Sequence, residues 1–167
     1  MKVIVCGVRD VAKIQEKENV TKILSILDFS PRPFYSINKK AEKTFIHCGD
    51  HEQSFDISSP TTEVVKKILT FSANLNNNDI IIVHCMAGIS RSCAAALIIA
   101  WDHTRDIKEC ERFIRSVRPI AAPNRLMCEL ADEWFNNKQY DLYNLANKLC
   151  KERYYARLVN NKRGLND

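Results

Sequence analysis

With 167 residues, the chain has the size of one ordinary domain and is too short for two. Its composition, 46% hydrophobic and 27% charged, is near the globular average and excludes an extended disordered protein. The net charge of +5 favours anionic substrates or partners without identifying one. The longest apolar run, residues 93–101, is about half as long as a membrane span, and the start has no signal-peptide pattern. We therefore expect one cytoplasmic domain over residues 1–167, without a membrane span.

Apolar segments rich in β-branched residues predict four strands, each bounded by polar or turn residues. They cover residues 2–6, 21–27, 44–48 and 79–84. Between them, the spacing of apolar residues predicts helices at 8–17 and 61–75, the second after a Ser-Pro start. Residues 28–41 and 49–60 are predicted to form two long irregular loops. Strands that alternate with helices predict an α/β fold with a mostly parallel sheet.

From residue 90 onward every segment has a helical pattern. Four helices are predicted, at residues 90–104, 107–117, 123–135 and 140–159. Together with the earlier helices they would cover both faces of a small sheet of four or five strands. The extension at residues 136–167 is basic, with seven Lys or Arg against three acidic residues. We interpret it as an extra, solvated C-terminal helix, with a docking surface for nucleic acid or an acidic protein as the alternative.

The seven cysteines are spread along the chain with no C-x-x-C pair. An odd number without close pairs predicts neither a disulfide framework nor a zinc site. Free thiols in a reducing compartment are the simpler interpretation. We accordingly expect no metal and no cofactor.

The residues that could carry chemistry gather where the fourth predicted strand ends. A fully apolar strand, residues 80–83, leads into His84 and Cys85. Arg91 follows after five residues, at the start of an Ala-rich helix. Backbone N–H groups of a short loop and a first helical turn can point at one anion, and Gly88 allows the tight turn that this requires. The same field stabilises a thiolate, so the pattern predicts a nucleophilic Cys85.

Three neighbours of Cys85 have predicted roles. Arg91 presents a planar fork of donors that can hold two phosphoryl oxygens through the transition state, which lysine cannot do. Ser92 is placed to donate its hydroxyl to the sulfur and so help Cys85 leave when a phosphocysteine is hydrolysed. His84 is expected to orient the cysteine loop through hydrogen bonds, and an ordinary histidine at a strand end is the other interpretation.

The segment HCMAGISRS, residues 84–92, resembles the H-C-x5-R-[ST] signature of the protein tyrosine and dual-specificity phosphatase superfamily. Residues 20–27, VTKILSIL, look like the second strand of small dual-specificity enzymes. Residues 118–125, RPIAAPNR, are similar to an RP…PN segment of the same group, including the compact bacterial tyrosine phosphatases that the chain resembles most. The resemblance covers roughly residues 1–135 and leaves the C-terminal helix outside.

This resemblance implies a dual-specificity-phosphatase-like fold and a phosphocysteine mechanism that needs no metal. It also implies that the substrate phosphate is bound by residues 85–91, called the phosphate loop below. The predicted binding residues are Met86, Ala87, Gly88, Ile89, Ser90 and Arg91. In relatives the Asn that follows Pro supports this loop, which implies that role for Asn124, and a helix N-cap is the other interpretation.

The resemblance further implies a general acid, an aspartate on a loop upstream of the nucleophile. Asp50 lies 35 residues before Cys85 and Asp56 lies 29 residues before it, so the spacing leaves both open. Asp50 is favoured because it directly follows the third predicted strand, whose carboxyl end faces the expected site. Asp56 precedes Ser-Ser-Pro and could serve only a turn.

We predict hydrolysis of phosphoproteins, phosphotyrosine first and with dual specificity open. The variable positions of the phosphate loop are neutral, whereas phosphoinositide phosphatases commonly carry lysines there. An RNA 5′-phosphatase is an alternative suggested by the basic tail. A non-catalytic phosphobinding module is the alternative from another class, and it would normally lack Cys85 or Arg91. The oligomeric state is not decided by the sequence.

Overall fold

The computed structural model describes residues 1–28, 40–54 and 56–163, the last three of these as backbone only. Its strands form one parallel sheet in the order β1–β4–β2–β3. Their bounds are β1 Lys2–Gly7, β2 Lys22–Leu27, β3 Glu42–His47 and β4 Ile80–Cys85. Within the described residues, the predicted small parallel sheet is therefore confirmed, with four strands.

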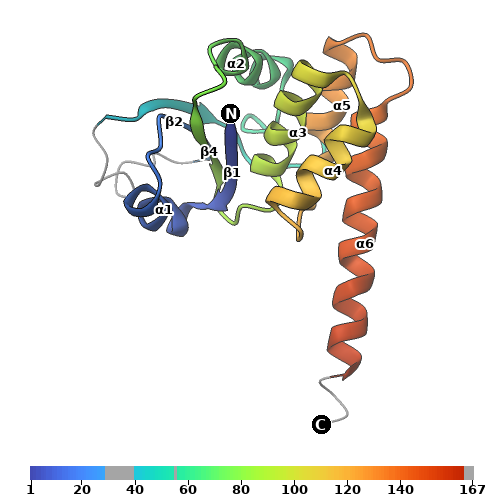
Figure 1. The fold of residues 1–167 in the computed structure, drawn as a ribbon. Coiled ribbons are helices and arrows are strands. Elements are labelled where there is room, and N and C mark those ends of the chain that lie inside the picture. Colours follow the sequence, from blue (N-terminus) through green and yellow to red (C-terminus); the bar gives the residue numbers. More distant parts are fainter. Residues whose placement is uncertain (29–39, 55, 164–167) are drawn as a thin grey trace.

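Helices cover both faces of this sheet, as predicted (Figure 1). On one face lies α1 (Val11–Lys17), which follows a 3-10 turn at Val8–Asp10. On the other face α2 and α3 lie against the strands, and three further helices pack around them. The bounds of these five helices are α2 Thr62–Ala73, α3 Arg91–Thr104, α4 Ile107–Val117, α5 Arg125–Trp134 and α6 Asp141–Arg163.

The two elements that flank the phosphate loop are deeply buried. β4 lies between β1 and β2, and its residues Ile81, Ile82 and Val83 are fully buried. A parallel strand covered on both faces is expected to be apolar throughout, as this one is. α3 is buried from residue 91 to 99, because three consecutive alanines let it approach its neighbours closely. The loop between them is thus held at both ends by rigid structure.

The predicted boundaries shift by a few residues where polar side chains take part in regular structure. β3 begins at Glu42, two residues before the predicted start, because an edge strand can expose polar side chains while its backbone pairs with β2. Lys22 and Glu42 form an ion pair at 2.7 Å across that pairing. α5 begins at Arg125, two residues later than predicted, because Asn124 caps it. Of the two predicted loops, residues 49–60 form no helix or strand where described, and residues 29–39 of the first lie outside the described residues.

The C-terminal helix α6 packs on the domain only through its first half. Four of its side chains are buried: Leu142, Leu145, Ala146 and Leu149. Ion pairs add to this contact, with Lys148 Nζ 2.8 Å from Glu111 and Arg115 2.9 Å from Glu152. The second half extends beyond the rest of the fold, at the end of the molecule where the strands finish (Figure 1). None of the described helices is both long and apolar enough to span a membrane.

Asp132, near the end of α5, is fully buried and caps the first turn of α6. Its Oδ1 accepts hydrogen bonds from Asn137 Nδ2 at 2.6 Å and from Leu142 N at 3.3 Å. Its Oδ2 accepts one from Tyr143 N at 2.8 Å. Burial raises the pKa of this carboxyl, and the three hydrogen bonds oppose the shift. The same side chain therefore satisfies the helix start and joins α5 to α6.

We expect Asp132→Ala to lower the free energy of unfolding by about 2 kcal/mol, because a helix cap is lost and buried N–H donors are left unsatisfied. Urea denaturation followed by circular dichroism measures this change. Glu133→Ala is the matched control, since it removes an exposed carboxylate from the next position of α5. Equal stability of the two variants would show that Asp132 does not hold α6.

Candidate active site

The phosphate loop is packed tightly against β1. Gly88 has φ +70°, and a Cβ there would lie 2.2 Å from the carbonyl carbon of Cys6. Val8 N donates a hydrogen bond to Met86 O at 3.2 Å. Only glycine fits at position 88, because both its backbone angle and its distance from β1 exclude a side chain.

The carbonyl groups of the phosphate loop are bound from outside. Arg118 donates from Nε to Gly88 O at 2.7 Å and from Nη2 to Ala87 O at 3.3 Å. Ala122 N donates to Ile89 O at 3.0 Å. In the part of the chain that the structure describes, none of the N–H groups of residues 86–90 donates to another residue. The loop therefore has a set of amide donors available for one anion.

Cys85 lies at the base of this loop, with its side chain only 1% exposed. Its Sγ is 3.2 Å from Ser92 Oγ, and Ser92 is itself fully buried in the first turn of α3. A hydroxyl at this distance can donate to the sulfur. The structure thus brings together the two residues that were predicted to act as nucleophile and as helper of the leaving sulfur.

Three of the other cysteines have raised pKa values. All seven are free thiols, and the six besides Cys85 are buried wholly or in part. Burial raises the pKa of Cys6 and of Cys93 to about 12, and that of Cys48 to about 11. These three sulfurs therefore stay protonated at neutral pH and are poor nucleophiles.

Arg91 is buried at the first position of α3, with 4% of its side chain exposed. Nη1 donates to Cys48 O at 2.6 Å, which fixes the guanidinium relative to the end of β3. Its Nε is buried and has no hydrogen-bond partner among the described residues, the nearest acidic atom being Asp50 Oδ2 at 3.8 Å. A buried donor without a partner is costly, so a ligand oxygen at this position would be stabilised.

Asp50 reaches the phosphate loop, although it comes from the segment after β3. Its Oδ1 accepts hydrogen bonds from Ser90 Oγ at 2.6 Å and from Asn124 Nδ2 at 3.1 Å. The side chain is 41% exposed, so it also faces the solvent from which a substrate would arrive. The carboxylate is therefore placed at the rim of the loop.

Asp56 is placed differently. Its Oδ1 accepts from the backbone N of Ser58 at 2.8 Å and from the hydroxyl of the same residue at 2.7 Å. These two hydrogen bonds lower the pKa of Asp56, and the nearby His51 lowers it further. The contacts are those of a turn residue, and the structure does not bring Asp56 to the phosphate loop.

Asn124 forms the expected N-cap, and its amide nitrogen bonds to the segment that carries Asp50 instead of to the phosphate loop. Its Oδ1 accepts from Met127 N at 2.9 Å, so it is the N-cap of α5. Its Nδ2 donates to Asp50 Oδ1 and, at 3.0 Å, to His51 O. The side chain thus supports the segment that carries Asp50, and touches the phosphate loop only through its backbone N, 3.4 Å from Ser90 O.

His84 is fully buried beneath the loop, with Nε2 2.8 Å from Ser25 Oγ on β2. Burial lowers the pKa of His84 to about 4, opposed in part by its interaction with the backbone of Cys85. The ring is therefore neutral at physiological pH and can exchange hydrogen bonds without adding charge next to the sulfur.

Sequence reasoning missed the contacts of three residues that hold the site together. Arg118 lies in the quoted RP…PN segment, yet no contact with loop carbonyls could be read from it. The pair Glu52 and Arg125, 3.0 Å apart, ties the segment after β3 to the start of α5. Among the described residues, no group of three His, Cys, Asp or Glu side chains is arranged to hold a metal ion.

One family profile matches most of the chain, and solved structures share its fold. The family profile described as dual specificity phosphatase, catalytic domain, matches residues 4–136. A search of curated proteins found no match. Among solved structures, that of DUSP15 has 21% sequence identity to this chain and a TM-score of 0.62. The match covers 90% of this chain and 91% of the DUSP15 chain. The Yvh1 phosphatase domain from Chaetomium thermophilum has 22% sequence identity and a TM-score of 0.64, and the match covers 81% of this chain and 90% of the Yvh1 chain. Human DUSP28 has 15% sequence identity and a TM-score of 0.62, and the match covers 82% of this chain and 93% of the DUSP28 chain.

These likenesses confirm the fold that the sequence predicted. The particular closeness to compact bacterial tyrosine phosphatases stays a prediction.

The burial of His84 predicts a pH dependence of stability. Because the folded-state pKa is lowered, the unfolded chain binds a proton that the folded chain does not, so stability is lost as pH falls from about 6.5 to about 4. We expect a slope of up to ~1.4 kcal/mol per pH unit in this window, measured by urea unfolding. Replacing His84→Gln should flatten the slope, whereas His47→Gln, at an exposed histidine, should not. The raised pKa of Asp132 changes stability with pH in the opposite direction, but Asp132 is present in wild type and in both variants, so its effect cancels in the comparison. A slope that persists in His84→Gln would contradict this assignment.

Proposed function

The chain belongs to the dual specificity phosphatase catalytic-domain family, a family of cysteine-dependent phosphatases, and from this membership we propose that it hydrolyses phosphoproteins, phosphotyrosine first, through a phosphocysteine on Cys85. The observation that supports this most directly is the position of the Cys85 sulfur. It lies beneath a set of loop amides that donate to no other described residue, and beside a buried arginine whose Nε has no hydrogen-bond partner among the described residues. A tetrahedral phosphoryl group is the ligand that such donors fit.

In the first step the Cys85 thiolate attacks phosphorus. A sulfur–phosphorus bond forms and the bond from phosphorus to the substrate oxygen breaks. Asp50, in its protonated form, donates its proton to that oxygen, so the substrate leaves as a neutral phenol or alcohol. The loop amides and Arg91 stabilise the charge on the three equatorial oxygens during the transfer.

In the second step water attacks the phosphocysteine. Asp50, now ionised, accepts the proton of the water, the sulfur–phosphorus bond breaks, and inorganic phosphate leaves. The departing Cys85 thiolate accepts a hydrogen bond from Ser92 Oγ, which lies 3.2 Å away in the resting structure. This contact lowers the barrier by stabilising negative charge on the leaving sulfur.

The choice of Asp50 as the acid is supported by its contacts. It bonds to Ser90 of the phosphate loop, whereas Asp56 is bonded to its own turn. A proton donor must lie within reach of the leaving oxygen, and the contacts of Asp50 place it there.

Phosphoprotein is the favoured substrate class because the variable positions of the phosphate loop carry no charge. The exposed Met86 and Ile120 add an apolar surface beside the loop, which suits an aromatic ring more than an inositol or a ribose. Turnover of a phosphotyrosine peptide, a phosphothreonine peptide, a phosphoinositide and a 5′-triphosphorylated RNA by one preparation ranks these classes. A higher kcat/KM for the RNA would replace the proposal with its alternative.

Cys85→Ser should abolish turnover while phosphate or vanadate still binds, because the hydroxyl does not ionise and the loop is retained. Arg91→Lys should also be nearly inactive, since it keeps the charge and loses the planar fork. Steady-state hydrolysis of a phosphotyrosine peptide measures both. Activity of Cys85→Ser within about tenfold of wild type, a barrier change of less than ~1.4 kcal/mol, would exclude Cys85 as nucleophile.

Asp50→Asn should lower turnover of a phosphotyrosine peptide by roughly 100-fold or more, the usual effect of losing one general acid. The loss should be smaller on an activated aryl phosphate, whose leaving oxygen needs little protonation. The basic limb of the pH profile of kcat/KM should flatten as well, once ionisation of the substrate is accounted for.

Asp56→Asn is the matched control for this variant, because it removes the same charge from the same loop without touching Ser90 or Asn124. It should change both substrates little. If Asp56→Asn lost turnover in this way and Asp50→Asn did not, Asp56 would be the acid. If neither variant showed a loss of turnover that depends on the leaving group, both residues would be excluded.

A further inference from the structure

The second half of α6 carries an exposed apolar surface. It consists of Tyr154, Tyr155, Leu158 and Val159, whose exposed fractions lie between 40% and 63%. Residues 154 and 158 are four positions apart, as are 155 and 159, so the four side chains are neighbours along one side of the helix. The rings of Tyr154 and Tyr155 lie edge to face with their centroids 5.7 Å apart, which joins the two pairs. We call these four residues the outer face of α6.

The outer face does not continue the side by which α6 packs on the domain. The buried side of the first half ends at Leu149. At 3.6 residues per turn, Leu158 lies roughly 180° around the helix from Leu149, and Tyr155 roughly 120°. A stripe that continued the packing would instead use the positions four and seven residues after Leu149, which are Arg153 and Ala156. The outer face is therefore turned away from the domain, whose core does not account for it.

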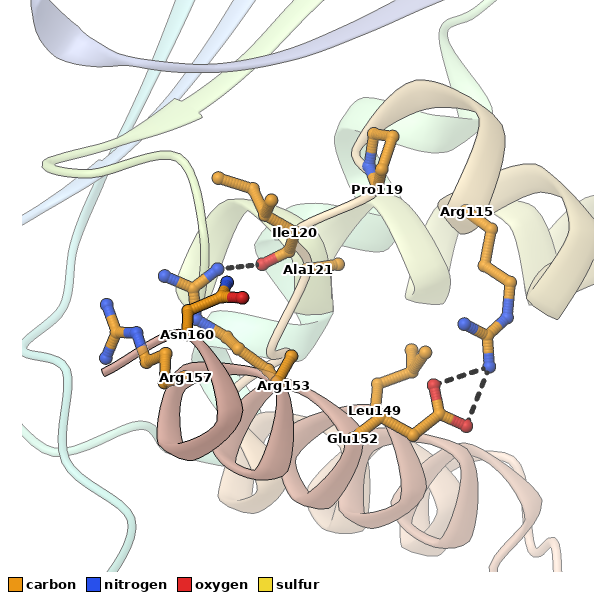
Figure 2. Close-up of a pocket in the computed structure, with 10 residues that line it drawn as sticks. Arg115, Pro119, Ile120, Ala121, Leu149, Glu152, Arg153, Arg157 and Asn160 are labelled. Carbon is orange, nitrogen blue, oxygen red and sulfur yellow. Dashed lines mark hydrogen bonds and ion pairs between the residues drawn. The ribbon is translucent and has the colours of Figure 1, made fainter. Parts of the chain in front are cut away.

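Basic side chains flank the outer face. Lys151 precedes it by one turn, and Arg153 and Arg157 lie within the same half of α6. None of the three forms an ion pair with a carboxylate of the described residues. The one acidic residue from 151 to 163, Glu152, is already paired with Arg115 at 2.9 Å. Figure 2 shows Arg153 and Arg157 at one end of this part of α6 and the Glu152–Arg115 pair at the other. The positive charge beside the outer face is thus left for a partner.

A second copy of the chain would fit this surface poorly. Two outer faces packed together would bring Lys151, Arg153 and Arg157 of both copies into one contact, and the acidic residue of the same stretch is already paired. Like charges brought together across an interface cost free energy and suppress the contact. The partner should therefore carry negative charge as well as apolar groups.

We propose that the outer face of α6 binds the surface of an anionic lipid bilayer. Leu158 and Val159 would enter the boundary between headgroups and acyl chains, and Lys151 and Arg157 would bind lipid phosphates. Such a surface supplies both of the groups that the outer face requires, and interfacial helices combine apolar and basic residues in this way. The second half of α6 extends beyond the rest of the fold, so a flat surface can approach it along its length (Figure 1).

The residue types favour a bilayer over a nucleic acid. A nucleic acid would match the basic residues and could stack on the tyrosines, but it would leave Leu158 and Val159 exposed to water. The hydroxyls of Tyr154 and Tyr155 form no hydrogen bond with another described residue. Tyrosine is enriched at membrane–water interfaces, where the ring is in an apolar layer and the hydroxyl is hydrated.

Cosedimentation with vesicles tests the proposal. We expect the full chain to bind vesicles of phosphatidylcholine mixed with phosphatidylserine, and to bind phosphatidylcholine alone much more weakly. Lys151→Gln with Arg157→Gln should lower the partition coefficient about fivefold for each charge removed. Tyr155→Gln with Leu158→Gln should lower it by about tenfold or more, because the apolar contact is lost.

Each double variant has a matched control elsewhere on the surface. Lys67→Gln with Lys108→Gln removes two exposed charges from α2 and α4. Phe45→Gln with Ile57→Gln removes two exposed apolar side chains from outside α6. Both controls should bind as wild type does. Glutamine is close to leucine in helix propensity, so circular dichroism should show the same helix content in the α6 variants. Tyr155→Trp, which keeps an aromatic ring on the outer face, should bind at least as tightly as wild type.

Three results would overturn the proposal. The first is a chain that stays in the supernatant with both kinds of vesicle. The second is an equal loss in a control and its α6 counterpart, or a loss in the charge variant without one in the apolar variant, since either would show general attraction between a basic protein and an anionic surface. The third is tighter binding to a single-stranded RNA, or to a synthetic amphipathic helix of Glu, Leu and Ala, that the apolar variant weakens more than it weakens vesicle binding. The readout is partitioning and not turnover, so loss of the catalytic proposal would leave this one standing, and the reverse.

Discussion

The site depends on one constraint, the outward orientation of the carbonyl groups of the phosphate loop. Each of the carbonyls from Met86 to Ser90 accepts a hydrogen bond from outside the loop. With the acceptors turned away, the N–H groups of the same peptides are left to converge on the space above Cys85. The donors come from the 3-10 turn that follows β1, from α3 and from the segment before α5, so three parts of the fold have to meet around seven residues. The close contact of Gly88 with β1 follows from the same requirement.

Burial keeps the titratable side chains around Cys85 uncharged, with the exception of Arg91. His84 lies directly before the nucleophile, and its lowered pKa keeps the ring uncharged. The thiols of Cys6 and Cys93, which also lie near the loop, stay protonated because burial raises their pKa. The positive charge close to the sulfur is then that of Arg91, backed by the loop amides. A second buried charge at this depth would cost several kcal/mol, which explains why neutral side chains fill the space.

The sequence predicts local features well and long-range contacts poorly, for a physical reason. The apolar run of β4 and the C-x5-R spacing are local, so the strand, the loop and the helix after it could be located from the residues alone. The start of β3 was misplaced because its polar residues are held by backbone pairing to β2, which leaves no periodic signal. Arg118 and the Glu52–Arg125 pair act on residues at least 30 positions away, and nothing in their own surroundings indicates the partner. Asp50 and Asp56 could not be separated by spacing, because their difference lies in which loop each carboxylate touches.

The position of Asp50 shows how the nucleophile and its acid are coupled without contact between them. The carboxylate bonds to Ser90, which belongs to the phosphate loop, and to Asn124, which caps α5. Asn124 in turn bonds to the backbone of His51, and Arg125 pairs with Glu52, so the whole segment after β3 is fastened to the start of one helix. That helix start also follows the residues whose N–H groups hold the loop carbonyls. A shift of the segment before α5 would therefore displace the anion site and the proton donor together, which preserves their relative geometry.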